Sequence, residues 1–218
     1  VPEYSQEVRL LYYKSLGIKF DKVLDIGAYI GTWKDMFKKI FPESNILMIE
    51  ANKEKEKILK KKGEYLIALL GSTNDEEIDY FKCEEEEISS GNSVYKENTN
   101  YKFIPERRKT ITLSTLLKDS SGFDLIKMDT QGSELDILKG GIDIIKQSKF
   151  LLLELSIIEY NFKAPTYSEI IRYLEENNFK LVDIFDLHYR NKSLIQIDGF
   201  FVNKKFEDII KLLNTRHL

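Results

Sequence analysis

The spacing of apolar residues changes repeatedly along this chain between a helical period and a strand-like period. Between residues 5 and 16 apolar side chains recur every three or four positions, with Val8, Leu11 and Leu16 on one face, so a helix is expected. A short apolar run at 22–26 ends at a glycine and predicts a strand. The same reasoning predicts helices at 32–41, 53–61, 133–139 and 167–177, and strands at 45–50, 65–70, 78–83, 123–129, 150–155, 181–185 and 193–203.

The order of these elements predicts an α/β fold. Strands that alternate with helices form right-handed βαβ units, which build a parallel sheet covered by helices on both faces. The last two predicted strands have no helix between them, so we expect them to pair antiparallel at one edge, with 78–83 as an additional short edge strand. The prediction is a Rossmann-like, mostly parallel seven-stranded sheet with an antiparallel final hairpin.

The domain organisation follows from what the sequence does not contain. It has no internal repeat and no linker rich in Pro, Gly or Ser, which favours one domain over 1–218, with an N-terminal helical region at 1–20. The stretch 84–108 is polar and has no clear period, so we interpret it as a long loop or mobile lid.

Composition narrows the classes of partner. Lysine and arginine number 33 against 36 acidic residues, a net charge of -3 that argues against a nucleic-acid partner bound through its phosphates. Cys83 is the single cysteine, which excludes an internal disulfide and fits a cytoplasmic location. No stretch has the apolar length of a membrane span. Because the first residue is Val1, we expect the sequence to have been trimmed.

The most specific local signal is a strand, a glycine turn and a helix at residues 23–32. Gly27 allows the chain to turn tightly, and the helix that begins near Gly31 directs free N–H groups into the crevice. Glu50 ends the next predicted strand, where an acidic side chain can accept the hydroxyl groups of a ribose. The predicted cofactor-binding residues are Asp25, Gly27, Ala28, Tyr29, Gly31, Thr32, Glu50, Ala51 and Leu69.

Dinucleotide-binding enzymes share this geometry, so the turn itself has two interpretations. Their G-x-G-x-x-G pattern needs a bare backbone beside the pyrophosphate, and here Tyr29 stands between Gly27 and Gly31. Asp25 suits the ammonium group of a cationic cofactor better than a pyrophosphate. S-adenosylmethionine is therefore favoured over NAD, and an NAD-dependent oxidoreductase remains the less favoured alternative.

A wider set of segments resembles one family. Residues 25–31, 125–134, 138–140 and 152–155 together are similar to the FkbM-type methyltransferases, and 196–202 is similar to a segment in part of that family. The resemblance implies S-adenosylmethionine as the cofactor and O-methylation, often of sugar or secondary-metabolite hydroxyls. The chain departs from the family at Tyr29, where asparagine is common.

The expected chemistry needs a group that deprotonates a small-molecule or glycan hydroxyl, either a base or a divalent metal. Asp129 ends the predicted strand 123–129 and Glu154 nearly ends the predicted strand 150–155, where open α/β sheets bind ligands. Asp129 is the first candidate as base or metal ligand, and Glu154 would share any metal. His188, expected in the loop between the last strands, is a further candidate base.

Three other titratable residues have structural interpretations. Glu134 fits a first-turn helix carboxylate, Asp198 a turn residue before Gly199, and His217 lies near the terminus. A non-catalytic module that only binds S-adenosylmethionine also remains open, because cofactor binding alone does not distinguish it from an enzyme.

Overall fold

The computed structural model describes residues 5–85, 90–206, 208, 209 and 211. His217 lies outside them, as do residues 86–89 of the proposed lid. The helices are α1 (Gln6–Ser15), α2 (Thr32–Ile40), the 3-10 turn η1 (Lys53–Lys55), α3 (Glu56–Leu59), α4 (Leu113–Leu116), α5 (Glu134–Gly140), α6 (Ile142–Ile145) and α7 (Tyr167–Glu176). The strands are β1 (Lys22–Ile26), β2 (Asn45–Glu50), β3 (Tyr65–Ile67), β4 (Glu77–Cys83), β5 (Phe103–Lys109), β6 (Leu125–Met128), β7 (Phe150–Ser156), β8 (Phe179–Arg190) and β9 (Ser193–Asn203).

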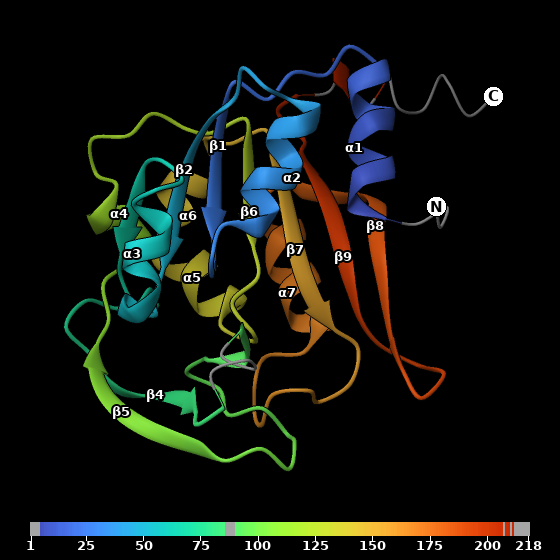
Figure 1. Cartoon of the computed structure of the whole chain (residues 1–218). Helices are drawn as coiled ribbons and strands as arrows, with labels where there is room; N and C mark the ends of the chain where they lie inside the picture. Colours follow the sequence, from blue (N-terminus) through green and yellow to red (C-terminus); the bar gives the residue numbers. More distant parts are fainter. Residues whose placement is uncertain (1–4, 86–89, 207, 210, 212–218) are drawn as a thin grey trace.

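The main sheet confirms the predicted α/β fold. Seven strands lie in the order β3-β2-β1-β6-β7-β9-β8 (Figure 1). Neighbours from β3 to β7 pair parallel, whereas β9 pairs antiparallel with both β7 and β8. The sheet order changes direction between β1 and β6, and ligands of open α/β sheets bind at such a switch point.

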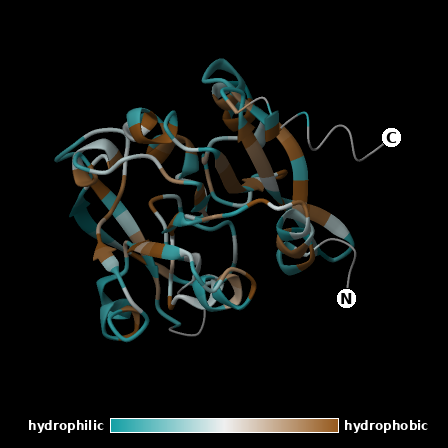
Figure 2. Ribbon diagram, turned by 90° about the horizontal axis from the view of Figure 1, so that it is seen from above, coloured by the Kyte–Doolittle hydropathy of each residue, from teal (hydrophilic) through white to brown (hydrophobic). Residues whose placement is uncertain are grey.

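Two apolar clusters hold the helices on the two faces of this sheet. Leu10 and Tyr13 of α1 join Phe37 and Ile40 of α2 in one cluster. The other cluster contains apolar residues of α4, α5, α6 and α7. Figure 2 shows hydrophobic stretches along the strands and mainly hydrophilic connecting loops. Among the described residues no helix is long and apolar enough to span a bilayer.

Two sequence predictions are wrong in the region of the proposed lid. Residues 78–83 do not join the main sheet, and 103–108 are not a loop, because β4 and β5 form a separate antiparallel ribbon. This ribbon lies beyond the carboxyl ends of the central strands (Figure 1). The segment between the two strands is anchored by Ser93, whose backbone exchanges hydrogen bonds with that of Phe81. Its side chain donates to the carbonyl oxygens of Thr130 and Gln131, at 3.1 and 2.8 Å.

The other differences concern short or irregular elements. The predicted helix 53–61 is a 3-10 turn followed by one short α-helix, and α4 and α6 were not predicted. β8 is longer than the predicted strand 181–185, so His188 lies within it rather than in a loop. β9 has the predicted bounds, and Asp198 is a paired residue within this strand rather than a turn residue.

Candidate functional site

The glycine turn after β1 is fixed by a close backbone contact. Gly27 has φ +76°, and a Cβ atom at this position would lie 1.8 Å from the carbonyl oxygen of Asp129. The amide groups of Gly27 and Ala28 both donate to the carbonyl oxygen of Ile49, at 2.9 and 3.1 Å. The turn is thereby joined to the ends of β2 and β6. The close backbone at position 27 requires glycine whether or not a ligand is bound.

Glu50 is the buried acceptor around which this end of the sheet is organised. One carboxylate oxygen accepts the backbone N–H of Tyr29 and the other accepts that of Asn52, each at 2.6 Å. Burial raises the pKa of Glu50, and the two backbone hydrogen bonds oppose the rise. Because the contact at position 29 uses the backbone, the tyrosine found in place of asparagine leaves it intact.

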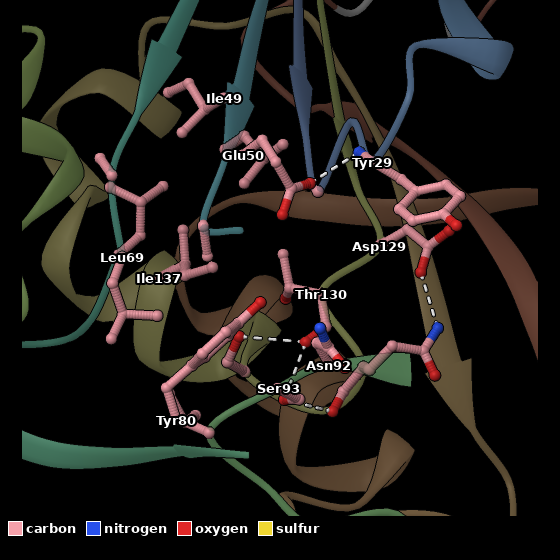
Figure 3. A pocket seen from close by; sticks show the side chains of 18 of the residues that line it. Tyr29, Ile49, Glu50, Leu69, Tyr80, Asn92, Ser93, Asp129, Thr130 and Ile137 are labelled. Carbon is pink, nitrogen blue, oxygen red and sulfur yellow. Dashed lines mark hydrogen bonds between the residues drawn. The ribbon is translucent and has the colours of Figure 1, made fainter. Parts of the chain in front are cut away.

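The glycine turn and Glu50 border a pocket at the carboxyl ends of the strands. Glu50 and Asp129 both belong to its lining, and Tyr80 and Ser93 lie across from Glu50 (Figure 3). Of the predicted cofactor residues, those that line the pocket are Gly27, Tyr29, Glu50, Ala51 and Leu69. Asp25, Ala28, Gly31 and Thr32 lie outside its lining. Sequence reasoning missed the far wall, which includes Leu70, Tyr80, Asn92, Ser93 and Ile137.

A chain of three charged groups lies next to the turn. Lys127 of β6 stands opposite Asp25 of β1 in the sheet register, and its Nζ is 3.4 Å from Asp25 Oδ1. The same Nζ is 3.5 Å from Asp129 Oδ2. Sequence reasoning missed Lys127, although a lysine inside an otherwise apolar strand is costly to bury without a partner and could have indicated it.

Asp129 and Glu154 lie close together, as predicted from their places at the strand ends. The side-chain amide of Gln131 donates to Asp129 Oδ1 and to Glu154 Oε2, at 2.9 Å each. Gln196 donates to the same Glu154 oxygen at 2.7 Å. Burial, together with the charges of Asp129 and Asp198, raises the pKa of Glu154 well above its ordinary value.

His188 faces Asp198 across the final hairpin. Its Nε2 is 3.3 Å from Asp198 Oδ2, and that oxygen also accepts a hydrogen bond of 2.7 Å from Gln6 of α1. Contact with Asp198 raises the pKa of His188, and partial burial opposes the rise. The imidazole therefore favours its charged form more than a free histidine does, which makes it a weaker candidate for a neutral base.

One group of side chains among the described residues has the spacing of metal ligands. It consists of Glu154, His188 and Asp198, whose ligand atoms all lie within 4.8 Å of one another. The predicted metal ligands were Asp129 and Glu154. The group with suitable spacing contains Glu154, but His188 and Asp198 take the place of Asp129. The glutamine donors on Glu154 and Asp198 already compensate part of their charge.

Glu134 organises the loop after β6. It accepts hydrogen bonds from the backbone and the hydroxyl group of Thr130, at 2.7 and 2.9 Å, and from the backbone of Gly132 at 3.1 Å. Burial raises the pKa of Glu134 to about 7, against the opposing effect of these hydrogen bonds. The structural interpretation of this residue therefore accounts for its contacts.

A second pocket adjoins the first. It is lined by Ser90, Gly91, Glu97, Tyr101, Gln131, Tyr160, Tyr189, Arg190, Ile195 and Gln196. Ser90 and Gln131 belong to the lining of both pockets. The two cavities therefore meet beside the Gln131 amide that holds Asp129 and Glu154.

Comparison with known proteins identifies a family for most of the chain. Residues 25–181 match the methyltransferase FkbM domain. No significantly similar sequence was found among curated proteins.

Similar solved structures share the fold at low identity. A methyltransferase FkbM from Methylobacillus flagellatus is 15% identical with a TM-score of 0.54, covering 90% of this chain and 48% of its own. The present chain thus spans about half the length of that protein. Magnesium protoporphyrin IX methyltransferase from Synechocystis, solved with bound S-adenosylmethionine, is 10% identical with a TM-score of 0.53, covering 90% and 76%. A putative O-methyltransferase from Klebsiella pneumoniae is 11% identical with a TM-score of 0.51, covering 91% and 79%.

Proposed function

Because the chain belongs to the FkbM family of S-adenosylmethionine-dependent methyltransferases, we propose that it transfers the cofactor methyl group to a hydroxyl oxygen of a small acceptor, with a sugar as the favoured class. The observation that carries this proposal is the junction of the two pockets at Gln131. In this proposal the first pocket takes the cofactor and the second takes the acceptor, so the two reactants would meet beside Asp129.

The first pocket supports cofactor binding through Glu50 and its apolar walls. Glu50 presents its carboxylate beside the glycine turn, and each oxygen that accepts a backbone N–H retains a second lone pair for a ribose hydroxyl. Ile49, Leu69 and Ile137 supply apolar surface for the adenine ring (Figure 3). When bound, the cofactor supplies an electrophilic methyl group on a sulfonium ion.

The second pocket has the chemistry of a carbohydrate site. The rings of Tyr101, Tyr160 and Tyr189 offer apolar surface for the faces of a sugar ring. Gln131 and Gln196 offer amide groups for its hydroxyls. Residues 90, 91, 97 and 101 come from the proposed lid, so this segment would cover the acceptor side.

Asp129 is the proposed general base. Its side chain is 38% exposed, it lines the first pocket, and Lys127 and Gln131 hold its two oxygens. These two contacts fix the position of the carboxylate that would accept the proton. Alignment of hydroxyl, methyl and sulfur then supplies much of the remaining rate.

The test is methyl transfer from labelled S-adenosylmethionine to a panel of mono- and oligosaccharides, with Asp129→Asn beside the native enzyme. Asparagine retains the size of the side chain and removes its basicity, so kcat should fall by about a hundredfold or more. Affinity for S-adenosylhomocysteine should change little. Native kcat in Asp129→Asn would exclude this residue as the base and leave Glu154 and His188 as candidates.

Two alternatives predict different outcomes in the same experiment. A non-catalytic binding module would bind S-adenosylhomocysteine but methylate no acceptor in the panel. An NAD-dependent enzyme would bind NAD in preference, which the family match disfavours.

A further inference from the structure

Lys127 is a buried cation with carboxylates on two sides. Its side chain is 7% exposed, and its ammonium group lies 3.4 Å from Asp25 Oδ1 and 3.5 Å from Asp129 Oδ2. The ammonium also lies 5.9 Å from the centre of the Trp33 ring. Lysine is rarely buried to this degree unless it is paired, so the two carboxylates account for its position.

Asp25 depends on this cation. Its side chain is fully buried, and neither carboxylate oxygen has a hydrogen-bond partner of good geometry among the described residues. Burial raises the pKa of Asp25, and the charge of Lys127 opposes the rise. The carboxylate would otherwise be neutralised by a proton, since an isolated buried charge is very costly.

The surrounding charges make Lys127 the principal counter-ion. Glu50 of β2 and Glu154 of β7 add negative charge from neighbouring strands, and Asp129 adds more from the end of β6. Lys34 of α2 is a further cation that acts on Asp25, with a smaller effect than Lys127. The pocket end therefore carries more acidic than basic groups, and Lys127 lies at its centre.

We propose that Lys127 is a positioning residue whose buried ammonium group keeps Asp25 charged, so that this end of the pocket attracts the ammonium and sulfonium groups of the cofactor. The inference rests on the proposed function. Asp25 lies two residues before Gly27, which lines the pocket, and a fixed charge acts strongly across a buried, low-dielectric region. Lys127 would thus serve the cofactor site without lining it.

The first experiment measures whether Lys127 and Asp25 act as a charge pair, and it needs no ligand. Urea unfolding is compared for the native protein, Lys127→Met, Asp25→Asn and the double variant. Lys127→Met should be strongly destabilised, because it leaves Asp25 buried without its cation. Adding Asp25→Asn should restore part of that loss. Strictly additive losses would overturn the pair.

A matched control exists at the amino end of the strands, where Lys149 directly precedes β7. Lys149 pairs with Asp124 at 2.6 Å, but its side chain is 42% exposed. Lys149→Met should change stability little, because exposed ion pairs contribute little.

The second experiment follows S-adenosylhomocysteine binding by calorimetry between pH 6 and pH 8. In the native protein Lys127 lies 3.4 Å from Asp25, so the native profile serves as the reference for the other groups that titrate in this range. In Lys127→Met, Asp25 loses its counter-ion and takes up a proton as the pH falls, so the loss of affinity from pH 8 to pH 6 should exceed that of the native protein by about tenfold. Lys149→Met should follow the native profile.

The outcomes separate the two proposals. If the native protein fails to bind S-adenosylhomocysteine, the proposed function fails, while the stability cycle still tests the charge pair. If the native protein binds and Lys127→Met shows the same dependence on pH as the native protein, the positioning role is overturned. Should Lys127→Met not fold, Lys127→Gln takes its place in both experiments, and the same results decide.

Discussion

Glu50 is expected to support both the fold and the cofactor site, and its removal gives the most direct measure of this end of the sheet. Glu50→Ala would leave the N–H groups of Tyr29 and Asn52 without the acceptor that each now has at 2.6 Å. A buried donor left unsatisfied costs about 1–3 kcal/mol. Asn52 is buried and Tyr29 only half-buried, so the expected loss is about 2–4 kcal/mol.

Glu50→Gln provides the graded comparison. Its remaining carbonyl oxygen can keep one of the two N–H groups, so the loss should be about half as large, or about 1–2 kcal/mol. Urea unfolding followed by circular dichroism should therefore rank the proteins native, Glu50→Gln, Glu50→Ala. Glu56→Gln, which changes an exposed glutamate that accepts a hydrogen bond from Tyr65, should lie within about 0.5 kcal/mol of the native protein.

The same variants test the predicted ribose contact. S-adenosylhomocysteine should bind Glu50→Gln at least about tenfold more weakly, because a carboxylate is a stronger acceptor than an amide oxygen. An unfolding midpoint of Glu50→Ala equal to that of the native protein would refute the role in the turn. Unchanged affinity in Glu50→Gln would refute the ribose contact separately.

Three further predictions concern the loop after β6, the glycine turn and the metal. Burial raises the pKa of Glu134 to about 7, so its contribution to stability is present below its unfolded pKa and is lost as the pH rises through 7. Between pH 5 and pH 8 the free energy of unfolding of the native protein should therefore fall by roughly 2 kcal/mol more than that of Glu134→Gln. Parallel pH profiles of the two proteins in urea unfolding would contradict this. Gly27→Ala places a Cβ atom 1.8 Å from the carbonyl oxygen of Asp129 at φ +76°, so it should yield little folded protein, and a thermal midpoint near the native value would show that the turn can shift. If Glu154, His188 and Asp198 hold a divalent ion, a chelator should abolish methyl transfer and Mn²⁺ should restore it, whereas activity unaffected by chelator would assign deprotonation to a protein base alone.

The fold was predictable because its strands are strongly apolar and clear turn residues separate the elements. The strand ending at Gly27 and the runs at 45–50 and 150–155 are buried on both faces of a parallel sheet, which produces continuous apolar segments. The approach of Asp129 and Glu154 also followed from sequence, since parallel strands bring their carboxyl ends to one edge. That Gln131 links the two carboxylates did not follow, because a side-chain amide in a loop has no periodic signal.

The missed strands have physical explanations. β5 carries Glu106, Arg107, Arg108 and Lys109 because it belongs to a two-stranded ribbon with one largely exposed face, so it lacks an apolar repeat. β8 contains register shifts at three places, and each moves the following side chains out of the simple alternation of a regular strand. His188 follows two of these shifts, which explains why the sequence pattern placed it in a loop.

The face of the main sheet that carries the chemistry is a continuation of its core face. On β1 and β6 the residues Val23 and Leu125 belong to the cluster that packs against α1 and α2, and two positions later the same face presents Asp25 and Lys127. On β7 it passes from Leu152 to Glu154 in the same way, and Glu154 stands directly opposite Asp198 of β9.

The charged residues at the carboxyl ends of these strands make the fold less stable than apolar residues would. Like charges that face each other across strands are destabilising. Burial raises the pKa of Glu154, and the charges of Asp129 and Asp198 raise it further. Apolar residues at these positions would extend the core at lower cost, so the fold alone does not account for Asp25, Lys127, Glu154 and Asp198. They occur where the parallel strands end and two pockets meet, which is where a methyl donor and its acceptor would need fixed charges.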